Sequence, residues 1–144
     1  MYNLQSHIIL IDDDRDDLEI LSTILEEKDI MVKTFQSPVK ALVYLAGARM
    51  NAELPSLIIL DYNMPLQNGY QVLLSIKENN DTKDIPVVIH STNMSNLLKK
   101  QLSDAGACGC FRKPWTYQEL SAQADLFQEL CVSFAKTKLV SEVA

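Results

Sequence analysis

Cysteine is scarce in this chain of 144 residues, and its spacing excludes two kinds of small domain. The three cysteines, Cys108, Cys110 and Cys131, are an odd number with no disulfide framework, which fits a reducing compartment. A zinc site would need further Cys or His ligands at workable spacing, and the only histidines, His7 and His90, stand alone. We therefore expect neither a disulfide scaffold nor a zinc domain.

Long apolar runs and basic clusters are missing as well. No run approaches the ~20 residues that span a bilayer, and residues 1–7 lack the basic start and apolar centre of a secretory signal. We therefore expect a cytoplasmic protein with no membrane segment. The 13 basic residues form no cluster and are outnumbered by 19 acidic ones, for a net charge of -6. Because binding to a phosphate backbone draws on Lys and Arg clusters, we expect no nucleic-acid partner.

The chain does contain strand and helix patterns that alternate five times without a linker of Gly, Ser or Pro. The expected strands are 7–11, 31–35, 57–60, 87–90 and 109–112, and the expected helices are 15–28, 38–47, 69–78, 96–105 and about 116–134. This alternation predicts a doubly wound α/β fold with a parallel sheet covered on both faces.

The length fits one domain, 1–144, with its core at about 6–128 and residues 129–144 forming the end of the last helix and a tail. We expect the tail from residue 136 to fray or to contact a partner, and we expect no output domain.

Two of the expected strands end on aspartate. The run at 8–11 leads into Asp12 and Asp13, and the run at 57–60 leads into Asp61. In an open sheet of order 2-1-3-4-5, ligands bind where the strand order reverses, between the first and third strands. Gathered carboxylates repel each other, by ~1 kcal/mol per pair at 4 Å in water. The pattern therefore predicts a hard divalent cation, Mg²⁺ or Mn²⁺, at this edge.

The other strand ends add groups that suit phosphate. Ser91 follows the fourth expected strand, and Lys113-Pro114 follows the fifth. A hydroxyl and an ammonium group beside clustered carboxylates indicate a phosphoryl-transfer site. Three further acids open the first expected helix and are predicted to be cap and first-turn residues rather than ligands: Asp14, Asp16 and Asp17.

Taken in order, these residues resemble the receiver domain of two-component response regulators, of the single-domain, chemotaxis-regulator-like type. The resemblance covers about residues 6–128 and rests on four elements: Asp12-Asp13, Asp61-Tyr62-Asn63-Met64-Pro65 with Gly69, Ile85-Pro86 leading to Ser91, and Lys113-Pro114. It implies a flavodoxin-like fold and a phosphoprotein of a phosphorelay. Such a protein is not a conventional enzyme, because its chemistry is limited to its own phosphorylation and dephosphorylation.

The resemblance also implies roles for the acids. Asp61 is the phosphoacceptor, and its phosphoryl group comes from a sensor histidine kinase or a histidine phosphotransfer protein. Asp13, Asp61 and the main-chain carbonyl of Asn63 hold Mg²⁺ or Mn²⁺, and Asp12 acts through a metal-bound water.

For the remaining residues the resemblance implies phosphate contacts by Lys113 and Ser91 and a cis peptide at Pro114. The switch aromatic of the family lies three residues before the lysine, where this chain has Cys110, although Phe111 and Trp115 lie nearby. The signal is expected to pass through the fourth helix, fifth strand and fifth helix to a protein partner or a second copy. Two secondary positions follow the serine: Thr92, which competes for the hydroxyl role, and Asn93, which like Asn63 affects phosphate lifetime.

Two alternatives remain beside this interpretation. Asp12-x-Asp14 is similar to the nucleophile motif of haloacid-dehalogenase-like phosphatases. However, Asp16 stands where that motif has Thr or Val, and the acidic pair after the lysine is missing. The second alternative is a receiver-like interaction module that is not phosphorylated.

Overall fold

Five parallel strands form one sheet in the order β2-β1-β3-β4-β5. The structure, a computed structural model, describes residues 7–48, 50 and 54–143, with side chains as far as residue 135. The elements are β1 (His7–Ile11), α1 (Arg15–Glu26), β2 (Met31–Phe35), α2 (Pro38–Ala48), β3 (Leu57–Leu60), α3 (Gly69–Glu78), β4 (Val87–Ser91), α4 (Asn96–Asp104), β5 (Gly109–Arg112) and α5 (Tyr117–Val143). The predicted fold class and strand order are confirmed.

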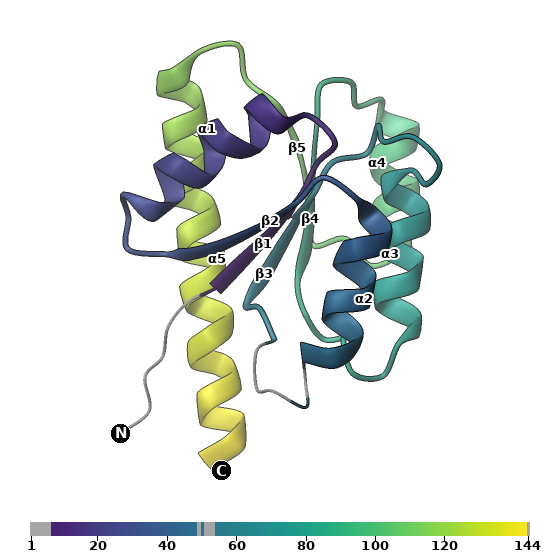
Figure 1. Cartoon of the computed structure of the whole chain (residues 1–144), viewed down its shortest axis with the longest axis vertical. Coiled ribbons are helices and arrows are strands. Elements are labelled where there is room, and N and C mark those ends of the chain that lie inside the picture. Colours follow the sequence, from purple (N-terminus) through teal and green to yellow (C-terminus); the bar gives the residue numbers. More distant parts are fainter. Residues whose placement is uncertain (1–6, 49, 51–53, 144) are drawn as a thin grey trace.

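Helices cover both faces of the sheet (Figure 1): α1 and α5 lie on one face, and α2, α3 and α4 lie on the other. Successive residues of a strand point to opposite faces, so a strand buried on both sides must be apolar throughout. In β1, Ile8 and Leu10 pack toward α1 and α5, whereas Ile9 and Ile11 pack toward the other three helices. This double burial explains why the central strands are uninterrupted aliphatic runs.

Several boundaries differ from the expected ones, those of α2 and α4 by a single residue at the C-terminal end. β4 includes Ser91, because Ser91 pairs with Arg112 and accepts a hydrogen bond from the backbone N–H of Lys113. α1 ends at Glu26 rather than residue 28, because the chain turns through Asp29 at φ 61°. α5 continues beyond residue 134 to Val143, so the residues expected to form a tail are helical as far as the backbone is described, and the expectation that they fray or contact a partner stays a prediction. Ser6 and Ala144, which the expected domain limits include, lie outside the described residues.

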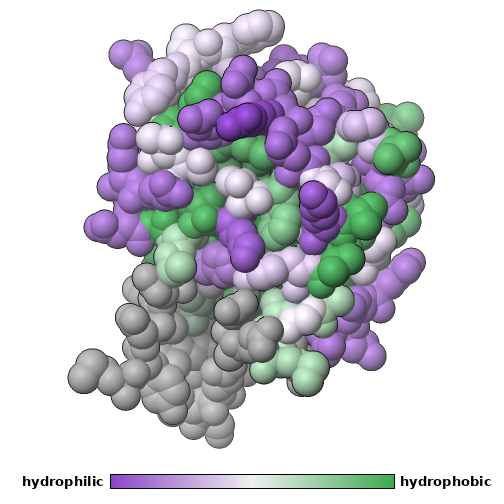
Figure 2. All heavy atoms as spheres, viewed as in Figure 1, coloured by the Kyte–Doolittle hydropathy of each residue, from purple (hydrophilic) through white to green (hydrophobic). Residues whose placement is uncertain are grey.

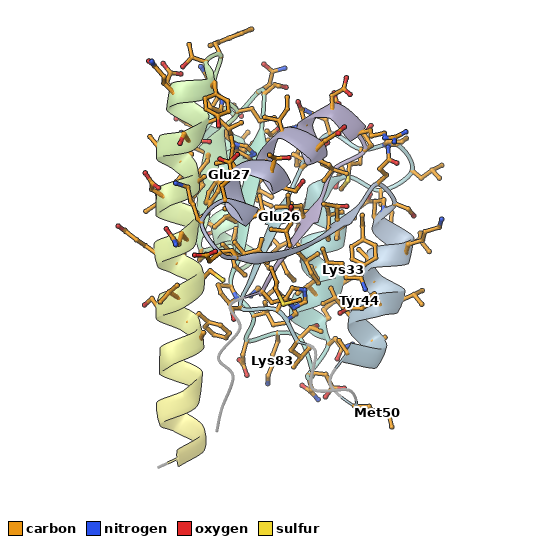
Figure 3. All side chains as sticks on the ribbon, turned by 60° about the vertical axis from the view of Figure 1, so that its left-hand side comes forward. Glu26, Glu27, Lys33, Tyr44, Met50 and Lys83 are labelled. Carbon is orange, nitrogen blue, oxygen red and sulfur yellow. The ribbon has the colours of Figure 1, made fainter. Side chains whose placement is uncertain are left out.

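The edge strand β2 is covered in part by α2. The ammonium group of Lys33 lies 4.1 Å from the centroid of the Tyr44 ring, and Figure 3 shows these two side chains next to each other. The Phe35 ring lies 5.4 Å from the same tyrosine. A cationic side chain held over an aromatic ring protects an edge that could otherwise pair with another chain.

None of the helices that the structure describes is long and apolar enough to cross a bilayer.

Candidate functional site

The register of the central strands brings two aspartates together. Ile11 of β1 pairs with Leu60 of β3, so the next residues, Asp12 and Asp61, leave the sheet side by side. The backbone N–H of Asp61 donates to the carbonyl of Ile11 at 2.8 Å, which extends the ladder by one bond. The two acids therefore lie at the carboxyl edge of the sheet, where the strand order reverses, as the sequence predicts.

Asp12, Asp13 and Asp61 form one acidic group. One carboxylate oxygen from each residue can be chosen so that all three lie within 4.8 Å of one another. Asp12 and Asp61 are buried, and Asp13 is exposed. An all-oxygen donor set that faces solvent on one side suits Mg²⁺ or Mn²⁺, which keep several water ligands. The predicted metal residues are thus brought together, with Asn63 two residues beyond Asp61.

The side chain of Lys113 brings a positive charge to this site. Its Nζ lies 2.6 Å from Oδ2 of Asp12, 2.9 Å from Oδ2 of Asp17 and 3.6 Å from Oδ1 of Asp61. The first two contacts are hydrogen bonds, and the third is an ion pair at longer range. The predicted lysine therefore reaches the acids from the end of β5, the far side of the sheet edge.

Asp17 is a residue of the site that sequence reasoning placed elsewhere. Asp14 is the N-cap of α1, as expected, and its Oδ1 accepts from the N–H groups of Asp16 and Asp17. Asp17 was expected to be only a first-turn acid, yet its carboxylate binds Lys113. Helical spacing contained the signal: Asp17 precedes the buried Leu21 by four residues and therefore lies on the helix face that meets the sheet.

Burial and mutual repulsion disturb the titration of these groups. Burial, with the charges of Asp12 and Asp13, raises the pKa of Asp61 from 3.8 to about 7, although Lys113 opposes the shift. Burial also raises the pKa of Asp12. Burial lowers the pKa of Lys113, but its hydrogen bonds to Asp12 and Asp17 outweigh this, and the pKa rises above its usual range. Without a bound cation, the acids are therefore in unfavourable proximity.

The hydroxyl of Ser91 lies near the loop that follows the phosphoacceptor position. Ser91 is fully buried, and its Oγ accepts a hydrogen bond of 3.2 Å from Nδ2 of Asn63. Thr92 and Asn93 are exposed. The structure thus places the serine, rather than the adjacent threonine, in contact with the Asp61 loop.

Gly69 shapes the same loop from its far end. Its N–H donates to the carbonyl of Tyr62 at 2.8 Å, and a Cβ at this position would lie 2.7 Å from the backbone oxygen of Asp61. No other residue type fits this close approach without a backbone shift.

Cys110 and its aromatic neighbour point to opposite faces of the sheet. Cys110 pairs with Ile89 and packs on the side of α2, α3 and α4, whereas Phe111 packs edge-on against Phe127 of α5, with ring centroids 5.3 Å apart. Phe111 therefore does not replace the missing aromatic on the Cys110 face. Trp115 also contacts neither core, because it is 95% exposed.

The Lys113–Pro114 peptide is trans, since no peptide bond in the described residues is cis. The cis expectation is thus wrong, and trans is the form that most X–Pro bonds adopt.

A cavity of about 230 Å³ opens beside these groups, between α1 and α5. Asp61 and Lys113 line its polar end, and Leu21 and Leu120 line its apolar part. In Figure 2, hydrophilic side chains dominate the upper part of the molecule, the end at which the strands lead into the site loops.

The comparisons with known proteins agree with this geometry. The sequence profile of the response regulator receiver domain matches residues 8–125, and the chain therefore belongs to that family. The two-component response regulator ORR5 of Oryza sativa subsp. japonica is 37% identical over 109 residues, which are 75% of this chain and 78% of ORR5. Membership identifies a two-component signalling protein and decides against the haloacid-dehalogenase-like alternative.

Two solved structures are similar to the whole fold. The phosphorylated cyanobacterial phytochrome response regulator RcpA has a TM-score of 0.80 and 27% identity, with 90% of this chain and 95% of RcpA covered. The Mn²⁺-bound form of response regulator Rcp1 has a TM-score of 0.73 and 25% identity, with 83% and 88% covered. The predicted flavodoxin-like receiver fold is confirmed.

Proposed function

We propose that this protein is a phosphoacceptor of a phosphorelay, that Asp61 receives the phosphoryl group, and that the reaction depends on Mg²⁺ or Mn²⁺. The observation that carries the proposal is the position of the Asp61 carboxylate, which is buried at the sheet edge within 4.8 Å of two other acids and 3.6 Å from Lys113. The phosphorylated state of RcpA and the bound Mn²⁺ of Rcp1 support it by analogy.

In the proposed reaction, a carboxylate oxygen of Asp61 attacks phosphorus and forms an acyl phosphate. The bond from phosphorus to the donor nitrogen of a phosphohistidine breaks, and its electron pair leaves with the imidazole. Asp13, Asp61 and the carbonyl of Asn63 would hold a divalent cation, with Asp12 acting through a water on that cation, and the cation would neutralise carboxylate charge and screen the phosphoryl oxygens. Asp61 must be ionised to attack, and a bound cation would favour this form, because burial and the charges of Asp12 and Asp13 raise its pKa to about 7.

Lys113 and Ser91 are the residues that meet the new group. A lysine ammonium has three N–H donors, of which two bind Asp12 and Asp17, so that one is available for a phosphoryl oxygen on Asp61. The Ser91 hydroxyl accepts from Asn63 and can still donate its own proton to the phosphoryl group. The added charge of about −1.5 to −2 supplies the driving force for such a rearrangement.

The phosphoryl donor is a sensor histidine kinase or a histidine phosphotransfer protein in this proposal. The cavity between α1 and α5 provides an apolar surface beside Asp61, on which such a partner can place its phosphohistidine. The output is a change of affinity for a protein partner or a second copy at the α4, β5 and α5 face, where Leu97 and Tyr117 are exposed. With Cys110 on β5, this switch operates without the usual aromatic.

The test is incubation of the full chain with Mg²⁺ and acetyl phosphate, followed by mass spectrometry. We expect a gain of one phosphoryl group that is stable in acid and labile in base. Asp61→Asn should abolish the gain, and Asp16→Asn, which removes an exposed acid from the same region, should retain it.

Two outcomes contradict the proposal. Absence of any mass gain in the wild type would favour a receiver-like module that is not phosphorylated. A gain that persists in Asp61→Asn would place the phosphoryl group on another residue.

A further inference from the structure

Besides Asp12, Lys113 has a second hydrogen-bonded carboxylate partner, Asp17, which lies outside the acidic group that contains Asp61. The Nζ–Oδ distance to Asp17, 2.9 Å, is shorter than the 3.6 Å to Asp61. Asp17 comes from α1, Lys113 from the end of β5 and Asp61 from β3, so the contact exists only because α1 packs against this edge of the sheet. The lysine side chain is mostly buried, at 13% exposure, whereas that of Asp17 is 43% exposed.

We propose that Asp17 is a positioning residue that holds Lys113 away from Asp61 and weakens the hold of the site on a phosphoryl group. The proposal rests on phosphorylation of Asp61. In this proposal, Asp17 determines how tightly the site binds the phosphoryl group and how long the group is retained.

The argument is electrostatic. When they are all ionised, the acids around Lys113 and the metal position, Asp12, Asp13, Asp17 and Asp61, carry four negative charges, and the lysine supplies one positive charge. A phosphoryl group brings further negative charge to Asp61. Asp17 both repels this group and binds the ammonium that would stabilise it. Removal of the Asp17 charge should therefore strengthen the interaction between Lys113 and the phosphoryl oxygens.

A matched pair of variants separates this contact from a general effect of charge. Asp16 and Asp17 are neighbours in the first turn of α1, and each variant to Asn removes one charge from that turn. Of these two acids, only Asp17 takes part in an ion pair with Lys113 in the described part of the chain. The difference between Asp17→Asn and Asp16→Asn thus measures the contact itself.

The experiment is a titration of the full chain with trifluoroberyllate, a phosphoryl mimic that binds an aspartate, at saturating Mg²⁺. Binding is followed by calorimetry or by the fluorescence of Trp115, the single tryptophan, two residues after Lys113. We expect Asp17→Asn to bind the mimic about three- to tenfold more tightly than the wild type and Asp16→Asn to stay within about twofold. The difference should persist at high salt, because a close and partly buried pair is screened little.

A second measurement uses the protein phosphorylated by acetyl phosphate. Loss of the phosphoryl group should be slower in Asp17→Asn than in Asp16→Asn, and thermal melting of both variants should show an equally intact fold. If Asp17→Asn binds the mimic no more tightly than Asp16→Asn, the inference is overturned. The proposed function still stands in that case, provided that the wild type is phosphorylated. A wild type that takes up neither the mimic nor a phosphoryl group overturns both.

Discussion

Asp61→Asn should make the metal-free protein more stable, although it removes the residue on which the proposed reaction depends. The carboxylate of Asp61 lies within 4.8 Å of the oxygens of Asp12 and Asp13. At that distance, and at an effective dielectric of 20, each repulsion is about 3.5 kcal/mol. The attraction to Lys113 at 3.6 Å offsets about 4.6 kcal/mol. A net repulsion of about 2 kcal/mol remains, and the cost of burying the charge adds to it.

The pKa of Asp61 gives the pH range. In the unfolded chain the carboxyl group loses its proton near the ordinary value of 3.8, whereas the folded protein retains it to about 7. The folded state is therefore favoured by this group at low pH, and that advantage is lost progressively as the pH rises from about 4 to about 7. At about 1.4 kcal/mol per pH unit, the loss reaches up to about 4 kcal/mol above pH 7.

Urea denaturation in EDTA tests this loss of stability, because a neutral asparagine at position 61 removes the pH-dependent contribution of the carboxyl group to the unfolding free energy. We expect Asp61→Asn to exceed the wild type in unfolding free energy by about 2 to 4 kcal/mol near pH 8 and by almost nothing near pH 4. The contribution of His90, whose pKa burial lowers to about 4, cancels between the two proteins, because Asp61 is not among the groups that shift it. Added Mg²⁺ should stabilise the wild type and close the gap. A variant that is less stable than the wild type near pH 8 would refute the reasoning.

Three further variants test other parts of the structure. Asp13→Asn should weaken Mg²⁺ binding about tenfold or more, which calorimetric Mg²⁺ titration checks. Asp16→Asn should cost only about 0.3 to 1 kcal/mol of stability, which urea denaturation checks. Equal Mg²⁺ affinity in both variants would count against the site. Gly69→Ala should lower the melting temperature and slow phosphorylation by acetyl phosphate, because its Cβ would lie 2.7 Å from the backbone oxygen of Asp61; unchanged values would mean that the loop yields freely. Phe127→Ala should cost about 3 to 5 kcal/mol in urea denaturation, since this ring is fully buried; a loss below about 1 kcal/mol would contradict its place in the core.

The sequence was sufficient for the fold because the decisive signals are local. Apolar runs such as residues 57–60 indicate a strand buried on both faces, and helical spacing of Leu18, Leu21 and Leu25 indicates one buried stripe. Strands that alternate with helices leave few possible topologies. The position of Asp12 and Asp61 at one edge follows from those strands, and so the acidic group could be predicted before any coordinates.

The contacts between side chains of distant elements depended on the tertiary structure. Residue spacing shows that Asp17 lies in the first turn of a helix, but only the packing of α1 against the end of β5 brings it to Lys113. In the same way, packing brings Ser91 into contact with Asn63, and the sheet register places Cys110 and Phe111 on opposite faces. Secondary structure is determined by neighbours along the chain. The partner of a charged side chain is determined by distances and burial that arise only when the helices and strands pack together.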